Sequence, residues 1–192
     1  VAPTFTSSST FSVAEGGTTV ATLEGSDAVE GDGASFSTTL TGTDSGDFAL
    51  TTGGVLTFQA TTDFENPVCG TENDSNTCNI TATITDGTNE STQAITITVT
   101  NVNEAPVITS TSFTNIPEEQ ATIGNLAVTD DASDSISYAI TGGADRLKFS
   151  VSGAALSFSA NPNFEIPGDD GGNNVYEVEI TATDGGGLTD IE

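Results

Sequence analysis

The stretch CNITATITDG, residues 78–87, alternates apolar and polar side chains with a period of two and ends in an Asp-Gly pair. Such alternation is typical of a β-strand that buries one face, and Asp-Gly is typical of a turn. The stretch YEVEITATDG, residues 176–185, repeats the pattern in the second half of the chain. The inward-facing positions would be Cys78, Ile80, Ala82 and Ile84, and Tyr176, Val178, Ile180 and Ala182.

The repetition extends beyond this strand. APTFTS at 2–7 recurs as APVITS at 105–110, and VLTFQATTDFENP at 55–67 recurs as ALSFSANPNFEIP at 155–167. Gly, Asp, Asn and Ser separate the segments at the spacing of about 8–12 residues that is typical of a β-sandwich. No stretch has helical periodicity. We therefore predict an all-β protein of two homologous units.

The net charge of the chain restricts the classes of molecule that it can bind. The 192 residues contain 28 Asp and Glu but only 2 Lys and Arg, for a net charge of −26. Phosphate binding needs clustered Lys and Arg, so nucleic acid and an anionic membrane surface are excluded as partners. No apolar run reaches the ~18 residues of a membrane span, so we expect no membrane insertion. The chain also has no His, which rules out Ser-His-Asp and Cys-His catalysis, and we expect no enzymatic activity.

Cys69 and Cys78 are the two cysteines of the chain. Without a CxxC motif or a His, a zinc site has little support. A local disulfide fits better and indicates an oxidising, extracytoplasmic location, with two unpaired thiols as the alternative. The corresponding segment of the second half, PGDDGGNNVY at 167–176, has no Cys. Turns alone or an extra calcium ion on Asp169, Asp170 and Asn173 would have to hold it.

Two further elements occur in the same order in both halves, Glu15 and Glu118, and DFE at 63–65 and NFE at 163–165. ATDGGG at 182–187 and the linker NVNEAP at 101–106 accompany them. Together they resemble cadherin-like repeats, specifically the bacterial kind found in large surface proteins. The resemblance implies two tandem Greek-key cadherin-like (Ig-like) β-sandwiches, at 1–103 and 104–192, with calcium at their junction. The last strand of the second repeat is incomplete.

Calcium takes six to eight oxygen ligands, which a junction must collect from several loops. By the repeat pattern, the metal ligands would be Glu15, Asp63 and Glu65 of the first repeat, Asn101, Asn103, Glu104 and the Val102 carbonyl of the linker, and Asp130, Asp134 and Asp184 of the second repeat. Asn101 stands where the family usually has Asp, and Ala132 interrupts the paired-Asp element, for which Asp131 or Asp134 would substitute. We therefore expect fewer or weaker sites than three ions. Solvated loop carboxylates are the alternative.

Three functions follow. The first is an extracellular, calcium-rigidified structural or adhesive segment of a larger cell-surface protein, partnered by neighbouring repeats or by copies of the same protein. The second is a carbohydrate-binding module with polysaccharide as its partner, which the absence of Trp disfavours. The third is a subunit of an extracellular filament assembled by strand donation. It is motivated by the contrast between STQAITITVT at 91–100 and the short LTDIE at 188–192. Asp44, in the turn TGTDSGD, lies outside the ligand pattern.

Overall fold

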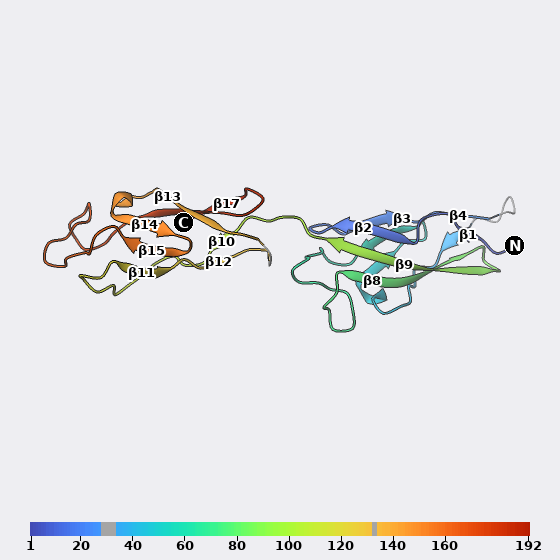
Figure 1. Cartoon of the computed structure of the whole chain (residues 1–192). Helices are drawn as coiled ribbons and strands as arrows, with labels where there is room; N and C mark the ends of the chain where they lie inside the picture. The colour runs from blue at the N-terminus through green and yellow to red at the C-terminus, as the bar shows by residue number, and fades with distance from the viewer. Residues whose placement is uncertain (28–33, 132–133) are drawn as a thin grey trace. The chain divides into compact units, whose positions relative to one another are not determined.

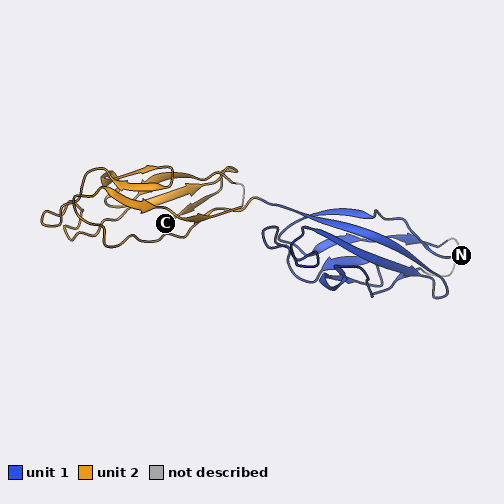
Figure 2. Ribbon diagram, turned by 60° about the horizontal axis from the view of Figure 1, so that its bottom comes forward, with its two compact units in different colours: residues 1–102 blue, residues 103–192 orange. Residues whose placement is uncertain are grey.

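A computed structural model describes residues 1–27, 34–131 and 134–192. The chain divides into two compact units, Val1–Val102 and Asn103–Glu192 (Figure 2). Within the described residues, helical structure is confined to two 3-10 turns, η1 (Ser45–Asp47) and η2 (Arg146–Lys148). The predicted all-β class is confirmed.

Unit 1 is a sandwich of two main sheets (Figure 1). One has the strand order β2 (Thr10–Ala14), β9 (Glu90–Thr100), β8 (Thr77–Thr85) and β5 (Ser35–Phe36). The other has the order β3 (Thr19–Thr22), β7 (Val55–Phe58) and β6 (Phe48–Leu50), and β1 (Thr4–Phe5) pairs separately with β4 (Gly25–Ser26). β9 is antiparallel to β8 and parallel to β2.

The core of unit 1 lies between these sheets and follows the alternation in the sequence. The inward-facing residues predicted for β8, Cys78, Ile80, Ala82 and Ile84, are all buried. β9 contributes Ile95, Ile97 and Val99 from the neighbouring strand. Cys78 is joined by a disulfide to Cys69, with a distance of 5.1 Å between the two Cα atoms. The period-two pattern therefore identified both the strand and its buried face.

Unit 2 contains two three-stranded sheets. One has the order β11 (Thr122–Asn125), β15 (Ala155–Phe158) and β14 (Phe149–Ser152), and the other has the order β13 (Ser137–Gly142), β16 (Glu179–Thr183) and β17 (Thr189–Ile191). β10 (Val107–Ile108) pairs separately with β12 (Val128–Thr129). The aromatic part of the core is formed by Phe149, Phe158 and Tyr176, whose rings contact one another.

One predicted strand is shorter than expected. The alternation predicted a strand from Tyr176, but β16 begins at Glu179. Ile180 and Ala182 are buried as predicted, whereas Tyr176 and Val178 are only half-buried. The cause is the neighbouring strand, because β17 pairs only with Thr181, Ala182 and Thr183. A strand without a partner loses the ladder that defines it.

Candidate metal-binding sites

The first acidic group lies in unit 1 and consists of Glu15, Asp63 and Glu65. Each offers a carboxylate oxygen, and these oxygens all lie within 4.8 Å of one another. Glu15 directly follows β2, and Asp63 and Glu65 lie in the loop after β7. The loop brings Asp63 into position through a turn in which its carboxylate accepts a hydrogen bond from the backbone N–H of Asn66 at 2.9 Å. The order of the motifs therefore produces a three-carboxylate group within one unit.

Glu15 holds this group in place. Its carboxylate accepts hydrogen bonds from the backbone N–H groups of Phe64, at 2.6 Å, and Val102, at 2.8 Å. Its own backbone N–H donates to the carbonyl of Thr100, the last residue of β9. The group thus lies at the end of unit 1 from which the linker departs, beside Val102.

The second acidic group lies in unit 2 and consists of Asp130, Asp134 and Asp184, again with carboxylate oxygens within 4.8 Å of one another. Asp130 follows β12, and Asp184 follows β16. The carboxylate of Asp184 accepts hydrogen bonds from the Asn103 side-chain amide and from the backbone N–H of Leu188, each at 2.7 Å. This group therefore lies where the linker enters unit 2.

The second group contains unpaired acceptors. Both carboxylate oxygens of Asp130 and the Oδ2 of Asp134 are buried, and they have no hydrogen-bond partner within the described ranges 1–27, 34–131 and 134–192. Buried acceptors in proteins are almost always paired, because desolvation of an unpaired carboxylate is costly. A divalent cation takes such oxygens as ligands. The donor set, three carboxylates and a nearby amide, consists entirely of oxygen ligands and suits a hard cation such as Ca²⁺.

The pKa values in this group move in opposite directions. Burial raises the pKa of Asp134, and the neighbouring carboxylates of Asp130, Asp184 and Asp131 raise it further. For Asp184, burial opposes ionisation, but the hydrogen bonds from Asn103 and the backbone outweigh it, so the pKa lies below its usual value. The carboxylate of Asp184 is thus held in its charged form beside the carboxyl group of Asp134, which resists ionisation. A cation would relieve that repulsion.

The structure brings together six of the predicted carboxylates as two groups of three. It also places Val102 against Glu15 and Asn103 against Asp184. Roles for Asn101, Glu104 and the Val102 carbonyl as ligands stay predictions, and Ala132 lies outside the described residues. Asp131, one of the two residues named as substitutes, is buried.

Two carboxylates with a structural role were missed. The sequence places Asp44 in a turn outside the ligand pattern, but only 2% of it is exposed, and its carboxylate accepts hydrogen bonds from the backbone N–H groups of Gly70 and Asn79. Asp145 is equally buried and accepts from Asp170 and Glu177. Each precedes a 3-10 turn. The recurrence of Asp before this turn in both halves was the signal in the sequence.

The second-half loop is held by turns. The two carboxylate oxygens of Asp169 accept hydrogen bonds from the backbone N–H groups of Asn173 and Asn174, at 2.8 and 2.9 Å. The side-chain carbonyl of Asn173 accepts from the N–H of Val175. The structure shows these turns, and an extra calcium ion on Asp169, Asp170 and Asn173 stays a prediction.

Searches with this chain found no matching family model and no matching curated protein. Solved structures do match. Human protocadherin-24 EC1-2 aligns with a TM-score of 0.66 and 18% identity over 100% of this chain and 92% of that one. Mouse cadherin-23 EC22-24 aligns with a TM-score of 0.59 and 20% identity, over 99% and 64%. The protocadherin GammaB4 extracellular domain aligns with a TM-score of 0.56 and 22% identity, over 99% and 31%. The chain therefore has a cadherin-like fold.

The described residues contain no helix that is long and apolar enough to cross a membrane.

Proposed function

We propose that this chain is a pair of cadherin-like repeats, 1–103 and 104–192, that acts as an extracellular, calcium-stiffened structural or adhesive segment of a larger surface protein. The repeats are of the bacterial kind. The observation that carries the proposal is the set of buried, unpartnered carboxylate oxygens on Asp130 and Asp134. A cation would satisfy such oxygens, and the fold is one in which the resemblance implies calcium.

Each acidic group is bonded to the linker. Val102 donates to Glu15 in one unit, and Asn103, the next residue, donates to Asp184 in the other. Three carboxylates alone fall short of the six to eight oxygens that calcium takes, so we propose that Asn101, Asn103, Glu104 and the Val102 carbonyl supply the remainder. An ion that is bound both by one of these acidic groups and by residues of the linker would restrict the motion of the linker.

The extracellular location is supported by the buried disulfide, since such bonds persist in oxidising compartments. The partners that we propose are neighbouring repeats or further copies of the protein. Polysaccharide has no comparable support. Sugar rings stack on exposed Trp and Tyr, but the chain has no Trp and both of its tyrosines, Tyr138 and Tyr176, pack against the core of unit 2. We also propose that the chain is not an enzyme.

Calcium titration of the intact chain tests the metal sites. Asp63→Asn and Asp134→Asn each remove one charge from one group without changing the side-chain volume, and we expect each to weaken calcium binding by about tenfold or more. Isothermal titration calorimetry measures this. The matched control is Glu72→Gln, because Glu72 is exposed and belongs to neither group.

Absence of calcium binding in the millimolar range would overturn the proposal, as would equal weakening by the control. Stiffening is measured separately by small-angle scattering with calcium and with chelator. We expect chelator to broaden the distance distribution, because repulsion among the carboxylates then acts on a linker that no ion restrains. An unchanged distribution would contradict the stiffening role while leaving the ion sites intact.

A further inference from the structure

Both basic side chains of the chain lie on one short turn of unit 2. Arg146 and Lys148 flank Leu147 in η2, and the sequence has no other Arg or Lys. All three side chains are exposed. At 84% exposure, Leu147 is the most exposed large apolar side chain among the described residues. The turn therefore presents two positive charges and an apolar side chain on a chain with a net charge of −26.

The fold does not require this basic turn. The corresponding turn of unit 1, η1, has the sequence Ser-Gly-Asp. The residues that precede the two turns have nearly identical backbone angles, with φ and ψ of −103° and 15° at Asp44 and of −102° and 16° at Asp145. Two very different triplets thus form one backbone conformation. The charge and the exposed Leu147 of η2 are therefore available for contact with another molecule.

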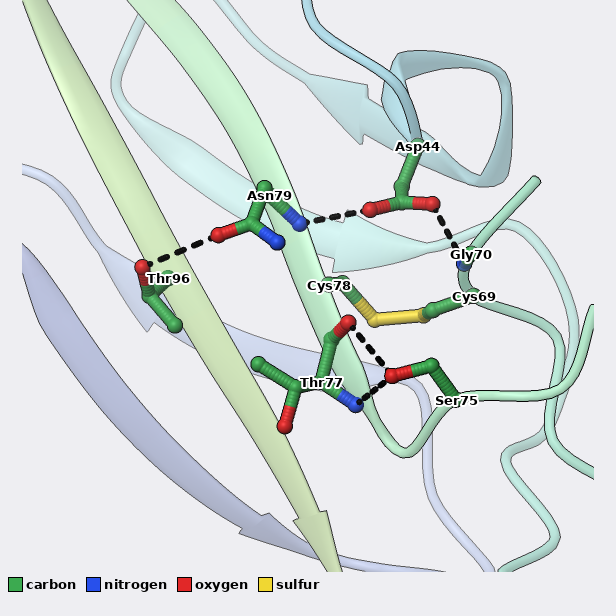
Figure 3. The surroundings of a disulfide bond; sticks show 8 residues. All are labelled: Asp44, Cys69, Gly70, Ser75, Thr77, Cys78, Asn79 and Thr96. Carbon is green, nitrogen blue, oxygen red and sulfur yellow. Dashed lines mark hydrogen bonds between the residues drawn. A yellow bond between two sulfur atoms is a disulfide. The ribbon is translucent and has the colours of Figure 1, made fainter.

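The corresponding place in unit 1 has the opposite charge. We call it the acidic patch, and it consists of the half-buried Asp47 and the exposed Glu72 and Asp74. Asp47 belongs to η1, and the other two lie in the loop that the disulfide closes. The loop is joined to the turn, because the backbone N–H of Gly70 donates a hydrogen bond to Asp44 at 2.7 Å (Figure 3).

Unit 2 makes the same connection without the acidic side chains. The backbone N–H of Asp170 donates to Asp145, also at 2.7 Å. Counted from this bond, Gly172 and Asn174 take the places of the two acidic loop residues of unit 1. Asp170 itself is exposed and contributes one negative charge. Equivalent surfaces of the two units are therefore complementary in charge, with two cations on one and three carboxylates on the other.

We propose that η2 of one copy of the chain binds the acidic patch of a second copy. The proposal rests on the proposed function, which takes further copies of the protein as partners. Like charges placed opposite each other disfavour a contact, and two chains with a net charge of −26 meet such opposition over most of their surface. Any ion pair between a basic side chain of one copy and a carboxylate of another must include η2, because both basic side chains lie there.

Leu147 gives this contact more than charge. Exposed ion pairs contribute little by themselves, because water screens them. An apolar side chain between the two cations would exclude water from the contact and strengthen the pairs. The patch favours a cation for its own reason. Burial raises the pKa of Asp47, and the neighbouring charge of Asp44 raises it further, so a cation beside Asp47 would stabilise its carboxylate.

The test exchanges the charges of the two surfaces in the intact chain. The turn variant carries Arg146→Glu and Lys148→Glu, and the patch variant carries Glu72→Lys and Asp74→Lys. Sedimentation velocity is measured at about 0.15 M ionic strength, where the screening length of about 8 Å suppresses repulsion between distant charges. Each variant alone places like charges opposite each other and should self-associate about tenfold or more weakly than the parent chain.

An equimolar mixture of the two variants places opposite charges together again, and it should associate about as strongly as the parent chain. Net charge alone predicts a different result. The patch variant is less negative than the parent, so it would associate more strongly if only net charge mattered. Recovery in the mixture therefore assigns the contact to these two surfaces.

Further variants test the apolar side chain and the fold. Leu147→Ser should weaken self-association, whereas the matched control Val107→Ser, at a side chain that is 54% exposed, should not. The triple variant Arg146→Ser, Leu147→Gly, Lys148→Asp gives η2 the sequence with which η1 forms the same turn. It should lose self-association and keep the melting temperature of unit 2. These two variants decide the result even if a charge-exchange variant is poorly folded.

Calcium titration separates this proposal from the function on which it rests. Neither the turn variant nor the patch variant changes a residue of the two three-carboxylate groups, so both should bind calcium as the parent does. A parent chain that binds calcium but stays monomeric up to about 1 mM would overturn the contact alone. So would a mixture that fails to recover. Labelled polyglutamate that binds η2 without any self-association would make a different acidic polypeptide the partner and would equally overturn the proposal.

Discussion

The loops that precede β8 and β16 occupy corresponding places in the two units but are held by different means. In unit 1 the loop is closed by the Cys69–Cys78 disulfide, beside which Asp44 accepts its two backbone hydrogen bonds (Figure 3). In unit 2 there is no Cys, and Asp169 organises the loop through backbone hydrogen bonds. Asp145 takes the place of Asp44.

The feature that both loops share is the buried aspartate, whereas the closure of the loop differs. The two units also share a side-chain amide that donates to the carbonyl of the preceding Phe, from Asn76 to Phe64 and from Asn174 to Phe164. In both units the carboxylate therefore positions the loop against the strand, and either a covalent bond or a turn stabilises the rest of the loop.

The turn before each aspartate needs a glycine. Gly42 and Gly143 have φ values of 108° and 93°, in the left-handed region. A Cβ atom at Gly42 would lie 2.9 Å from the carbonyl oxygen of Asn79, and one at Gly143 would lie 2.5 Å from that of Glu177. The chain approaches the neighbouring strand so closely here that only glycine fits, and this approach brings the aspartate into contact with that strand.

The largest effect that we expect comes from the aspartate in the loop without a disulfide. Asp145→Ala removes the buried acceptor of two backbone N–H groups, those of Asp170 and Glu177, and should destabilise unit 2 by about 3 kcal/mol. Asp44→Ala should cost unit 1 less, because the disulfide still holds the loop. Native-state hydrogen exchange of β16 and β8 measures each unit in the intact chain. Asp170→Ala is the control, since that side chain is exposed. Equal losses in both units would contradict the comparison.

The second-largest loss of stability should come from removing the disulfide. The double variant Cys69→Ala, Cys78→Ala opens a short loop and should lower the stability of unit 1 by about 2–3 kcal/mol, mainly by freeing the unfolded chain. Urea unfolding, followed through the exchange of β8 amides, measures the loss. Asp44→Ala is then added to the double variant. If the resulting loss of stability in unit 1 equals the loss that Asp145→Ala causes in unit 2, the disulfide accounts for the difference between the units. A smaller response would mean that other contacts hold the loop.

The smallest effect should come from Asp169, and it should depend on pH. Hydrogen bonds from the backbone N–H groups of Asn173 and Asn174 lower the pKa of Asp169 below its usual value of 3.8. Burial of the carboxylate acts in the opposite direction but does not outweigh them. A lowered pKa means that the folded state prefers the carboxylate, so the stabilisation is complete above that usual value and is lost as the pH falls through the folded pKa. Asp169→Ala should lower the melting temperature at pH 7, by less than the loss of the disulfide does.

The difference between the Asp169→Ala variant and the parent should shrink as the pH is lowered below 3.8. Calorimetric scans across this range measure it. A difference that stays constant with pH would show that Asp169 acts through packing, and that the turn does not depend on its charge.

Much of the fold could be predicted because alternation is a local property of the sequence. The buried face of β8, for example, can be read from Cys78, Ile80 and Ile84 alone. The start of β16 could not, because Tyr176 and Val178 have the correct pattern but, among the described residues, no strand beside them like the one that β9 provides for β8. Whether a strand forms depends on a partner elsewhere in the chain, and periodicity carries no information about that partner.

The acidic groups could be predicted for a different reason. Glu15, Asp63 and Glu65 are far apart in sequence, and only the order of motifs in two repeats indicated that they meet. Asp44 and Asp145 show the limit of this reasoning. An aspartate in a polar turn reads as solvated, and its burial becomes apparent only when the backbone donors of a neighbouring strand are placed beside it.

The parallel pairing of β2 with β9 has a mechanical consequence. Tension applied to the residues before β2 and after β9 would pull these two strands in opposite directions along their length, so the five residue pairs from Thr10–Thr96 to Ala14–Thr100 would be loaded together in shear. Unfolding under force is governed by the barrier to rupture, and many bonds that must break at once raise it. A pulling experiment on unit 1 should therefore find that these five pairs resist the force together and rupture at once.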